Sequence, residues 1–392
     1  MSIEQDVIKL LSDLIALPSV NPWQDFTRTE PPYGECRVVD YVENYFRPFG
    51  VKVERQEVFP GRHNVLVHIP GKDRSLAPVV LEAHMDTVGV DGMPAAFTPY
   101  VADGRLYGRG ACDTKGSLAA MMLACRQLLE EGLLPAKNCL LLGVADEEWG
   151  TTGIQRFAES GIKVSAAVIG EPTSLQVVSA HNGEIYFKIL AHGKAAHTSR
   201  PYLGINAITM MSDVIQVLRA RATSLYPQRL HPLCGPPQLT ASIIQGGSAE
   251  SVVPATCHVS FDRRVSPGEK WQEVLDEIKG WIAEDLDAET AKSVELIAPH
   301  YNMPPFETPV DHPLVLGLRA AVEDTLGHGE VVGVPYGTDA AFLAVTGVPV
   351  VVFGPGDIAQ AHNIGEYVDV DQLTAAVQIL KRFVLVEAKR LD

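Results

Sequence analysis

Six acidic or histidine side chains fall in turns of this chain, and most of them come just after a short apolar run. These residues are His84, Asp113, Glu147, Glu148, Glu171 and His362. The apolar runs are rich in Val, Ile and Leu, which is typical of buried strands in a parallel sheet. In such sheets, binding sites lie beyond the carboxyl ends of the strands. Because carboxylates and imidazoles converge there, the pattern favours a divalent-metal site over a packed core.

The pair Glu147-Glu148 follows closely after the apolar run 139–144. Two neighbouring carboxylates at the end of a buried strand repel one another in a low dielectric. A bound cation would offset this repulsion for one carboxylate, and the other carboxylate could activate a water molecule as a base. We therefore expect Glu148 to be a metal ligand and Glu147 to be a general base. The alternative for this pair is a solvated acidic loop.

Two further motifs place a carboxylate beside a candidate metal. In His84-Met85-Asp86 the acid is placed to accept the second ring N–H of a metal-bound imidazole, which fixes the tautomer of the ring. Taken alone, this motif is more typical of a surface pair. Asp113 lies in a glycine-rich turn just before a helix that we expect over residues 115–131. Asp113 is therefore a candidate N-cap of this helix and a candidate bridge between two metal ions, and the two roles are compatible.

With Glu171 and His362 added, the candidate ligands are two histidines and three carboxylates. This mixed nitrogen and oxygen ligation suits Zn²⁺ best, with Co²⁺ or Mn²⁺ as alternatives. Two ions would each take one histidine and one terminal carboxylate, with Asp113 as the bridge. Pairs of metal ions ~3.5–4 Å apart activate water and polarise carbonyls in aminopeptidases. Taken singly, Glu171 also fits a solvated turn, and His362 fits an exposed loop.

The elements that must position these side chains alternate between helices and strands. Helices are expected over residues 38–46 and 115–131, and strands over 51–58 and 64–69. The pattern predicts an α/β domain with a mostly parallel sheet flanked by helices.

From residue 177 to 298 the pattern becomes strand, strand, helix, strand, strand, helix, with Asn182-Gly183 as the expected turn of a first hairpin. This segment predicts an inserted α+β domain whose sheet has one open face. Alternating helices and strands return after it, so we expect the catalytic domain to consist of residues 1–176 and 299–392.

Composition excludes several classes of partner and location. The formal net charge of −16 would repel a nucleic-acid backbone, so we expect no nucleic-acid partner. No apolar run approaches the ~20 residues that span a bilayer, and the amphipathic first segment with early acids does not resemble a signal peptide. The six cysteines form no C-x-x-C pair. These features predict a cytoplasmic protein without a membrane partner.

In order along the chain, these motifs resemble those of the acetylornithine deacetylase / succinyl-diaminopimelate desuccinylase family, which also holds aminoacylases, carboxypeptidases and dipeptidases. The resemblance covers essentially the whole chain and includes Gly170-Glu171-Pro172-Thr173. It implies a zinc-exopeptidase-like catalytic domain with two zinc or cobalt ions and an inserted lid that usually dimerises. It assigns Asp86 as the orienting acid, Glu147 as the general base, and as ligands His84, Asp113, Glu148, Glu171 and His362.

The resemblance also implies residues that bind substrate. His197 matches the lid histidine that stabilises the tetrahedral oxyanion, commonly across the dimer. Arg264 matches the arginine that holds the substrate carboxylate, a task that suits its planar fork. Ser251 stands where many relatives carry Asn. Gly337 and Thr338 belong to a loop like that of the aminoacylase and carboxypeptidase branches.

The expected function is hydrolysis of the amide bond of a small N-acyl-L-amino acid by a homodimer that pairs through its lid. The segment 354–362 resembles the acetylornithine deacetylase branch, whereas the Gly337 loop resembles the others. A carboxypeptidase or dipeptidase acting on short peptides with a free C-terminal carboxylate is therefore the alternative. Arg264 argues against an aminopeptidase, and Glu147 argues against a metal-dependent binding protein without turnover. The missing G-x-G-x-x-G motif argues against a nucleotide-binding oxidoreductase.

Overall fold

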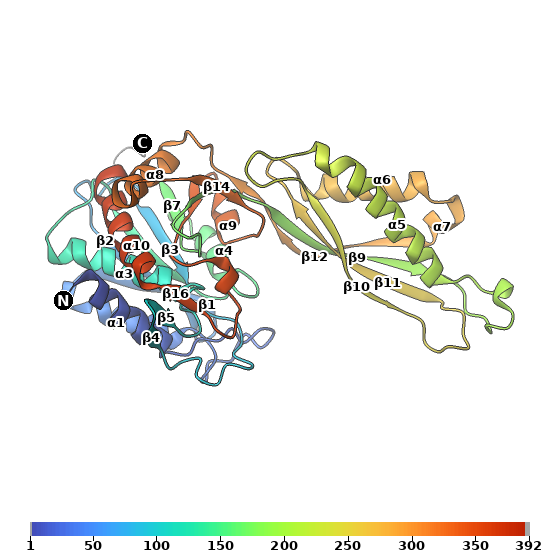
Figure 1. The fold of residues 1–392 in the computed structure, drawn as a ribbon, viewed down its shortest axis with the longest axis horizontal. Coiled ribbons are helices and arrows are strands. Elements are labelled where there is room, and N and C mark those ends of the chain that lie inside the picture. Colours follow the sequence, from blue (N-terminus) through green and yellow to red (C-terminus); the bar gives the residue numbers. More distant parts are fainter. Residues whose placement is uncertain (1, 389–392) are drawn as a thin grey trace. The chain divides into compact units, whose positions relative to one another are not determined.

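The computed structural model describes residues 2–388, which divide into two compact units. Unit 1 contains the chain up to Ser179, the segment Glu307–Val332 and the chain from Thr338 onward. Unit 2 contains Ala180–Phe306 and Gly333–Gly337. Figure 1 labels many of the elements of both units.

Unit 1 is built on a nine-stranded sheet with the strand order β1-β2-β6-β3-β7-β15-β8-β13, in which β14 also pairs with β8. The four central strands β6, β3, β7 and β15 are parallel, whereas β1, β2 and β8 pair in the antiparallel sense. The sheet therefore confirms the predicted mostly parallel α/β architecture. The bounds of its strands are β1 Lys52–Phe59, β2 Arg62–Ile69, β3 Val79–His84, β6 Cys139–Val144, β7 Ala166–Ile169, β8 Val177–His181, β13 Phe306–Glu307, β14 Val331–Val334 and β15 Val350–Val352.

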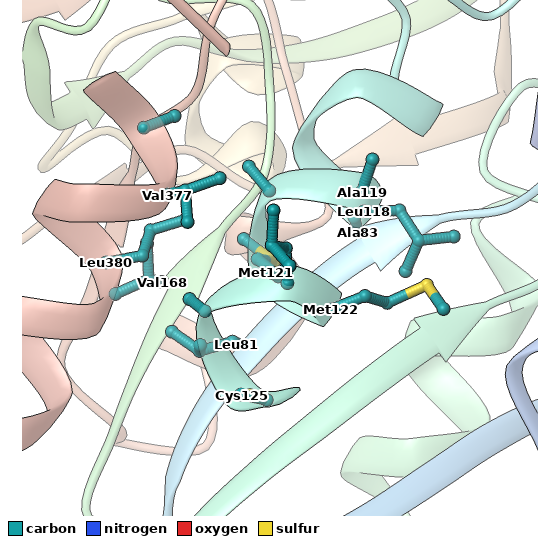
Figure 2. Close-up of a cluster of buried hydrophobic side chains, with 14 of the residues drawn as sticks. Leu81, Ala83, Leu118, Ala119, Met121, Met122, Cys125, Val168, Val377 and Leu380 are labelled. Carbon is teal, nitrogen blue, oxygen red and sulfur yellow. The ribbon is translucent and has the colours of Figure 1, made fainter. Parts of the chain in front are cut away.

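Five helices pack into one hydrophobic core with this sheet. Figure 2 shows a part of this core that includes side chains of α3, Leu81 of β3 and Leu380 of α10. Every residue from Lys115 to Cys125 of α3 is buried, as expected for a helix that is covered on all sides. The five helices are α1 Ile3–Ile15, α2 Cys36–Phe46, α3 Lys115–Glu130, α8 Pro313–Leu326 and α10 Val370–Arg382.

Shorter elements complete unit 1. The helices are α4 Thr152–Ala158 and α9 Ala340–Ala344, and a small sheet contains β4 Tyr100–Ala102, β5 Arg105–Tyr107 and β16 Tyr367–Asp369. Among the residues that the structure describes, no helix combines the length and apolarity needed to cross a membrane. All six cysteines lie in the described part of the chain, and none of them is in a disulfide.

Unit 2 contains a four-stranded antiparallel sheet with the order β10-β11-β9-β12. Two helices, α5 and α6, cover one face of it through a second hydrophobic core that includes Phe187, Val259 and Ile278, as Figure 1 shows. This antiparallel sheet with its own helices confirms the predicted inserted α+β domain. The bounds are β9 Gly183–His192, β10 Gln238–Gly246, β11 Thr256–Val265, β12 Val294–Met303, α5 Ala207–Leu225, α6 Trp271–Asp285 and α7 Ala288–Lys292.

The hairpin that we expected at Asn182-Gly183 is wrong. The strand before it, β8, pairs with β15 in the sheet of unit 1, and the strand after it, β9, pairs with β11 and β12 in unit 2. A side chain at Gly183 would bring a Cβ within 2.4 Å of the Met303 carbonyl oxygen. The absence of a side chain at Gly183 therefore lets β12 lie close to it. The dipeptide Asn182-Gly183 is the point where the chain passes from one sheet to the other.

Candidate metal centre and active site

The candidate ligands of unit 1 gather at one edge of the nine-stranded sheet. His84 is the last residue of β3 and pairs in parallel register with Val144, the last residue of β6. Glu147 and Glu148 follow β6, and Glu171 follows β7 two residues after its end. Because parallel strands end at the same edge, segments that are far apart in the sequence deliver their side chains to one place.

Asp113 lies between the two histidines. Its Oδ1 is 3.0 Å from His84 Nε2, and its Oδ2 is 3.3 Å from His362 Nε2. Glu148 Oε2 lies 3.1 Å from the same nitrogen of His362. One ligand atom from each of His84, Asp113 and Glu148 can be chosen so that all three lie within 4.8 Å of one another. The two oxygens of Asp113 thus face two histidines, which is the arrangement that a bridging carboxylate needs.

Glu171 and Glu147 complete the cluster on the side of His84. Glu171 Oε1 lies 4.0 Å from His84 Nε2, and Glu147 Oε2 lies 3.9 Å from the same atom. The structure therefore brings together all six residues that the sequence pattern selected. The expected N-cap role of Asp113 is wrong, because Thr114 occupies the N-cap position of α3.

The electrostatics of the cluster fit a divalent cation. Burial raises the pKa of Glu147 and of Glu171 well above the usual carboxyl range, and it raises the pKa of Glu148 to about 7. Hydrogen bonds to Asp113 and Glu148 raise the pKa of His362 to about 10. Several carboxylates thus crowd a buried space with too little positive charge. Two histidine nitrogens and several carboxylate oxygens are a donor set that Zn²⁺ or a similar ion accepts.

Asp86 has a different set of partners from the one expected. The ring Nδ1 of His84 lies 2.9 Å from the backbone carbonyl oxygen of Asp86 and 3.7 Å from its carboxylate. The carboxylate instead accepts the backbone N–H groups of Glu147 and Glu148, each at 3.1 Å. Asp86 therefore orients the histidine through its main chain and the two glutamates through its side chain.

A buried polar network that the sequence reasoning missed supports Asp86. Asn21 Nδ2 donates to Asp86 Oδ2 at 2.7 Å and to Asp146 Oδ1 at 3.0 Å. Arg62 pairs with Glu35 through two hydrogen bonds of 2.8 and 2.5 Å and reaches Asp146 at 3.4 Å. The backbone of Asp146 has φ of 69°, an uncommon conformation for a residue other than glycine. The network holds this strained residue directly before the glutamate pair.

Glu366, also missed, holds the loop that carries Asp113. Its Oε2 accepts hydrogen bonds from Arg109 Nη1 at 2.7 Å and from the N–H of Gly110 at 2.9 Å. Its Oε1 accepts the N–H groups of Cys112 and Asp113 at 2.9 and 3.0 Å. Glu366 is fully buried and stands four residues after His362. Its carboxylate thus ties the segment of one candidate ligand to the loop of another.

The predicted substrate-binding residues lie mostly in unit 2. His197 is exposed, and its Nδ1 accepts the N–H of Ser199 at 3.1 Å. Arg264 pairs with Glu184 and, at 3.0 Å, with Asp262, so its guanidinium is held by carboxylates of its own unit. The carbonyl oxygen of the exposed Ser251 accepts the N–H of Thr198 at 3.0 Å.

The loop with the remaining two predicted residues passes between the units. Gly337 belongs to unit 2, where a Cβ at its position would lie 2.1 Å from Met303 Sδ. Thr338 belongs to unit 1, where it is buried and its hydroxyl accepts the N–H of Ala340 at the start of α9.

Comparisons with known proteins agree with this geometry. Residues 80–386 match the sequence profile described as Peptidase family M20/M25/M40. The chain is 30% identical to an acetylornithine deacetylase of Vibrio campbellii, over 90% of this chain and 93% of that one. Its fold is similar to a tripeptidase of Staphylococcus aureus, with a TM-score of 0.80, 18% identity and 99% of each chain covered. It is also similar to a dinuclear metal-binding peptidase of Bacillus subtilis, with a TM-score of 0.72, 17% identity and 98% of each chain covered.

Proposed function

The chain belongs to peptidase family M20/M25/M40 and is a metallo-hydrolase of that family, and we propose that it hydrolyses the amide bond of a small N-acyl-L-amino acid. The observation that carries the proposal is the cluster of two histidines and four carboxylates, in which Glu147 stands beside the candidate ligands. The likeness to an acetylornithine deacetylase at 30% identity supports the deacylase assignment.

We propose that the cluster holds two divalent ions, Zn²⁺ in preference to Co²⁺ or Mn²⁺. Asp113 would bridge them, since its two oxygens face different histidines. His84 and Glu171 would complete one ion's ligands, and His362 and Glu148 those of the other. Bound there, the ions would lower the pKa of a water molecule and polarise the substrate carbonyl.

Glu147 is the proposed general base. Its N–H is held by Asp86, and its carboxylate lies within 4 Å of His84, so the side chain is positioned from both ends. Glu147 accepts a proton from the attacking water and later returns it to the nitrogen of the leaving amine. The new C–O bond forms at the carbonyl carbon, the C–N bond breaks, and the products are a carboxylic acid and a free amino acid.

The remaining roles fall to residues that bind the substrate. We propose that His197 donates to the developing oxyanion, acting across a dimer, and that Arg264 binds the carboxylate of the amino-acid half. In that case the substrate carboxylate replaces Asp262 or Glu184 on the guanidinium. Ser251, Gly337 and Thr338 are the proposed further contacts.

A homodimer through unit 2 is part of the proposal. The strand β10 is an edge strand that is exposed along most of its length, and its side chains Ile243 and Ile244 are 55% and 57% exposed. An exposed apolar edge strand is a template for pairing with another strand. Pairing of β10 with its copy in a second chain would cover these isoleucines and extend the sheet.

The second candidate function is a dipeptidase or carboxypeptidase. It is favoured by the likeness of the fold to peptidases and by the same proposed use of Arg264 for a free C-terminal carboxylate. An N-acyl amino acid and a dipeptide differ only in what lies on the carbonyl side of the scissile bond. A substrate panel therefore separates the two functions.

The test supplies the metal-loaded protein with N-acetylornithine, N-succinyl-diaminopimelate, N-acetylmethionine and Gly-Glu, and follows the release of amine. Glu147→Gln is measured beside the wild type, and Glu159→Gln, a change of an exposed acid, is the matched control. Release from an N-acyl amino acid that is lost only in Glu147→Gln supports the deacylase. Release from Gly-Glu alone would support the peptidase. No release with metal bound, from this panel or from N-benzoyl and N-octanoyl amino acids, would refute both.

A further inference from the structure

Two tryptophans of unit 1 are exposed beside the candidate active site. Trp23 is 43% exposed and Trp149 is 39% exposed, and their rings meet edge to face with centroids 4.9 Å apart. Tryptophan is highly buried on average, so two exposed indoles in contact form an unusual apolar surface. Exposed apolar surface of this kind commonly marks a binding site.

The backbone at both tryptophans is linked to Asp86, whose carboxylate orients the glutamate pair. Trp149 follows Glu148, whose N–H donates to Asp86 Oδ2 at 3.1 Å. The N–H of Trp23 donates to Asn21 Oδ1 at 2.8 Å, and Asn21 Nδ2 donates to the same Asp86 oxygen at 2.7 Å. The position of the tryptophan pair is therefore fixed relative to the proposed general base and ligand.

The backbone of Trp23 indicates that its exposed position is maintained against local preference. Its φ is 56°, in the left-handed region where a bulky side chain is a rare outlier. Such outliers persist only when the surroundings impose them, and they cluster at functional sites. Here the fully buried Asn21 supplies the constraint.

The charged residues near Trp23 indicate whether the pair would bind an anionic or an uncharged group. Arg28 is the one basic residue in the segment from Asn21 to Gly34, and it pairs with Glu30 at 2.6 Å. An anionic group would therefore gain little from this paired cation, whereas an uncharged apolar group would gain contact with two indole rings.

We propose that Trp23 and Trp149 form the acyl-group subsite of this enzyme and that it takes an uncharged apolar acyl group larger than acetyl, such as benzoyl or a medium-chain aliphatic acyl group. The assignment of the acyl half rests on the proposed function, in which Arg264 of unit 2 takes the carboxylate of the amino-acid half. The subsite then disfavours succinyl, because its carboxylate would lie against two apolar indole rings.

The experiment compares kcat/KM for N-benzoyl, N-octanoyl, N-succinyl and N-acetyl derivatives of one amino acid, chosen as the best amino acid in the panel above. The wild type is expected to favour benzoyl or octanoyl over acetyl. Trp149→Ala and Trp23→Ala are each expected to reduce that ratio about tenfold or more, the scale of a few methylene groups in an apolar pocket. Trp149→Phe, which keeps a ring, should retain most of the ratio.

Tyr100→Ala is the matched control, since Tyr100 is a 56% exposed aromatic residue elsewhere on unit 1, and its substitution should leave the ratio unchanged. A ratio that is the same in wild type and both tryptophan variants would overturn the subsite, and so would a wild-type preference for succinyl. If N-acetyl substrates are hydrolysed but the tryptophan variants do not change the ratio, the subsite alone is refuted and the proposed function stands. The absence of any N-acyl hydrolysis refutes the proposed function together with it.

A second readout does not depend on turnover. N-benzoyl amino acid is titrated into metal-loaded Glu147→Gln while tryptophan fluorescence is followed. A saturable change is expected, and it should be largely lost in Glu147→Gln/Trp23→Phe/Trp149→Phe, which removes both indoles of the subsite. Binding with an undiminished change in this triple variant would place the benzoyl group near Trp271 or Trp281, the other tryptophans of the chain, and would overturn the assignment.

Discussion

The substitution Glu366→Gln tests whether one buried carboxylate holds the metal-binding loop. The side chain keeps its size, but one oxygen becomes an NH₂ group that faces hydrogen-bond donors on either side. If this group turns toward Arg109 and Gly110, two charge-assisted hydrogen bonds are lost; if it turns toward Cys112 and Asp113, two others are lost.

The expected cost follows from the burial of the pair. Each hydrogen bond to a charged group contributes about 1.5–3 kcal/mol, and neutralising one partner of a buried ion pair costs about 3–5 kcal/mol. Arg109 is 3% exposed and Glu366 is fully buried, so no discount for solvent screening applies. We therefore expect a loss of about 3–5 kcal/mol in unfolding free energy, which lowers Tm by about 10 °C.

The functional expectation is separate from the stability expectation. Because Oε1 holds the N–H of Asp113, a displaced loop should weaken the bridging ligand, and comparable supporting groups change metal affinity about 10–100-fold. Competition with a chromophoric chelator measures this affinity, and thermal and urea unfolding measure stability. Asp369→Asn is the control, since its pair with Arg105 is exposed and should contribute little. A Glu366→Gln protein within 1 kcal/mol of wild type, with unchanged metal affinity, would refute the reasoning.

Three other outcomes are expected. His197→Ala should lose about 100-fold or more in kcat while keeping its metal, as for loss of an oxyanion donor; loss of the metal as well would indicate a structural role. Ile243→Lys should shift the dimer toward monomer in light scattering, and an unchanged mass would place the interface elsewhere. In chelator-treated protein, burial raises the folded pKa of Glu148 to about 7 and of Glu82 to about 8, above their unfolded values of about 4.5. The folded state therefore keeps these carboxyl groups protonated to higher pH than the unfolded state does. The stability that this contributes is complete below about pH 4.5 and is lost as pH rises through 7–8, so Tm should fall from pH 5 to 8. Over the same range, the increase in Tm caused by added Zn²⁺ should grow. A Tm that rises with pH in chelator would contradict the raised pKa values of Glu148 and Glu82.

The ligand cluster could be predicted from sequence because most of its members sit in a local pattern. A buried strand followed at once by a polar residue is visible in a window of ten residues, and parallel strands carry such residues to one edge. Asn21 and Glu366 have no such pattern. Asn21 contacts Asp86 from 65 positions away, and Glu366 contacts Asp113 from 253 positions away, so their roles exist only in the folded chain.

The misplaced hairpin has a related cause. Val177–His181 is buried at every position, the burial expected of a strand inside a two-sided sheet, whereas β9 alternates between buried and exposed residues along most of its length. Ser179 made the segment 177–180 look like an alternating strand as well. Polar side chains that are buried by tertiary contacts hide the difference between a central strand and a half-exposed one.

The strand order of unit 1 also constrains how the protein is made. β15 lies between β7 and β8, but about 170 residues of chain separate Val178 from its neighbour Val352. At 5–20 residues per second a ribosome needs roughly 9–35 s to cover that distance. Throughout this interval the facing edges of β7 and β8 lack their shared neighbour and are open to other chains. The yield of functional enzyme therefore depends on protection of an unfinished sheet during translation, a kinetic demand that the stability of the completed fold does not relieve.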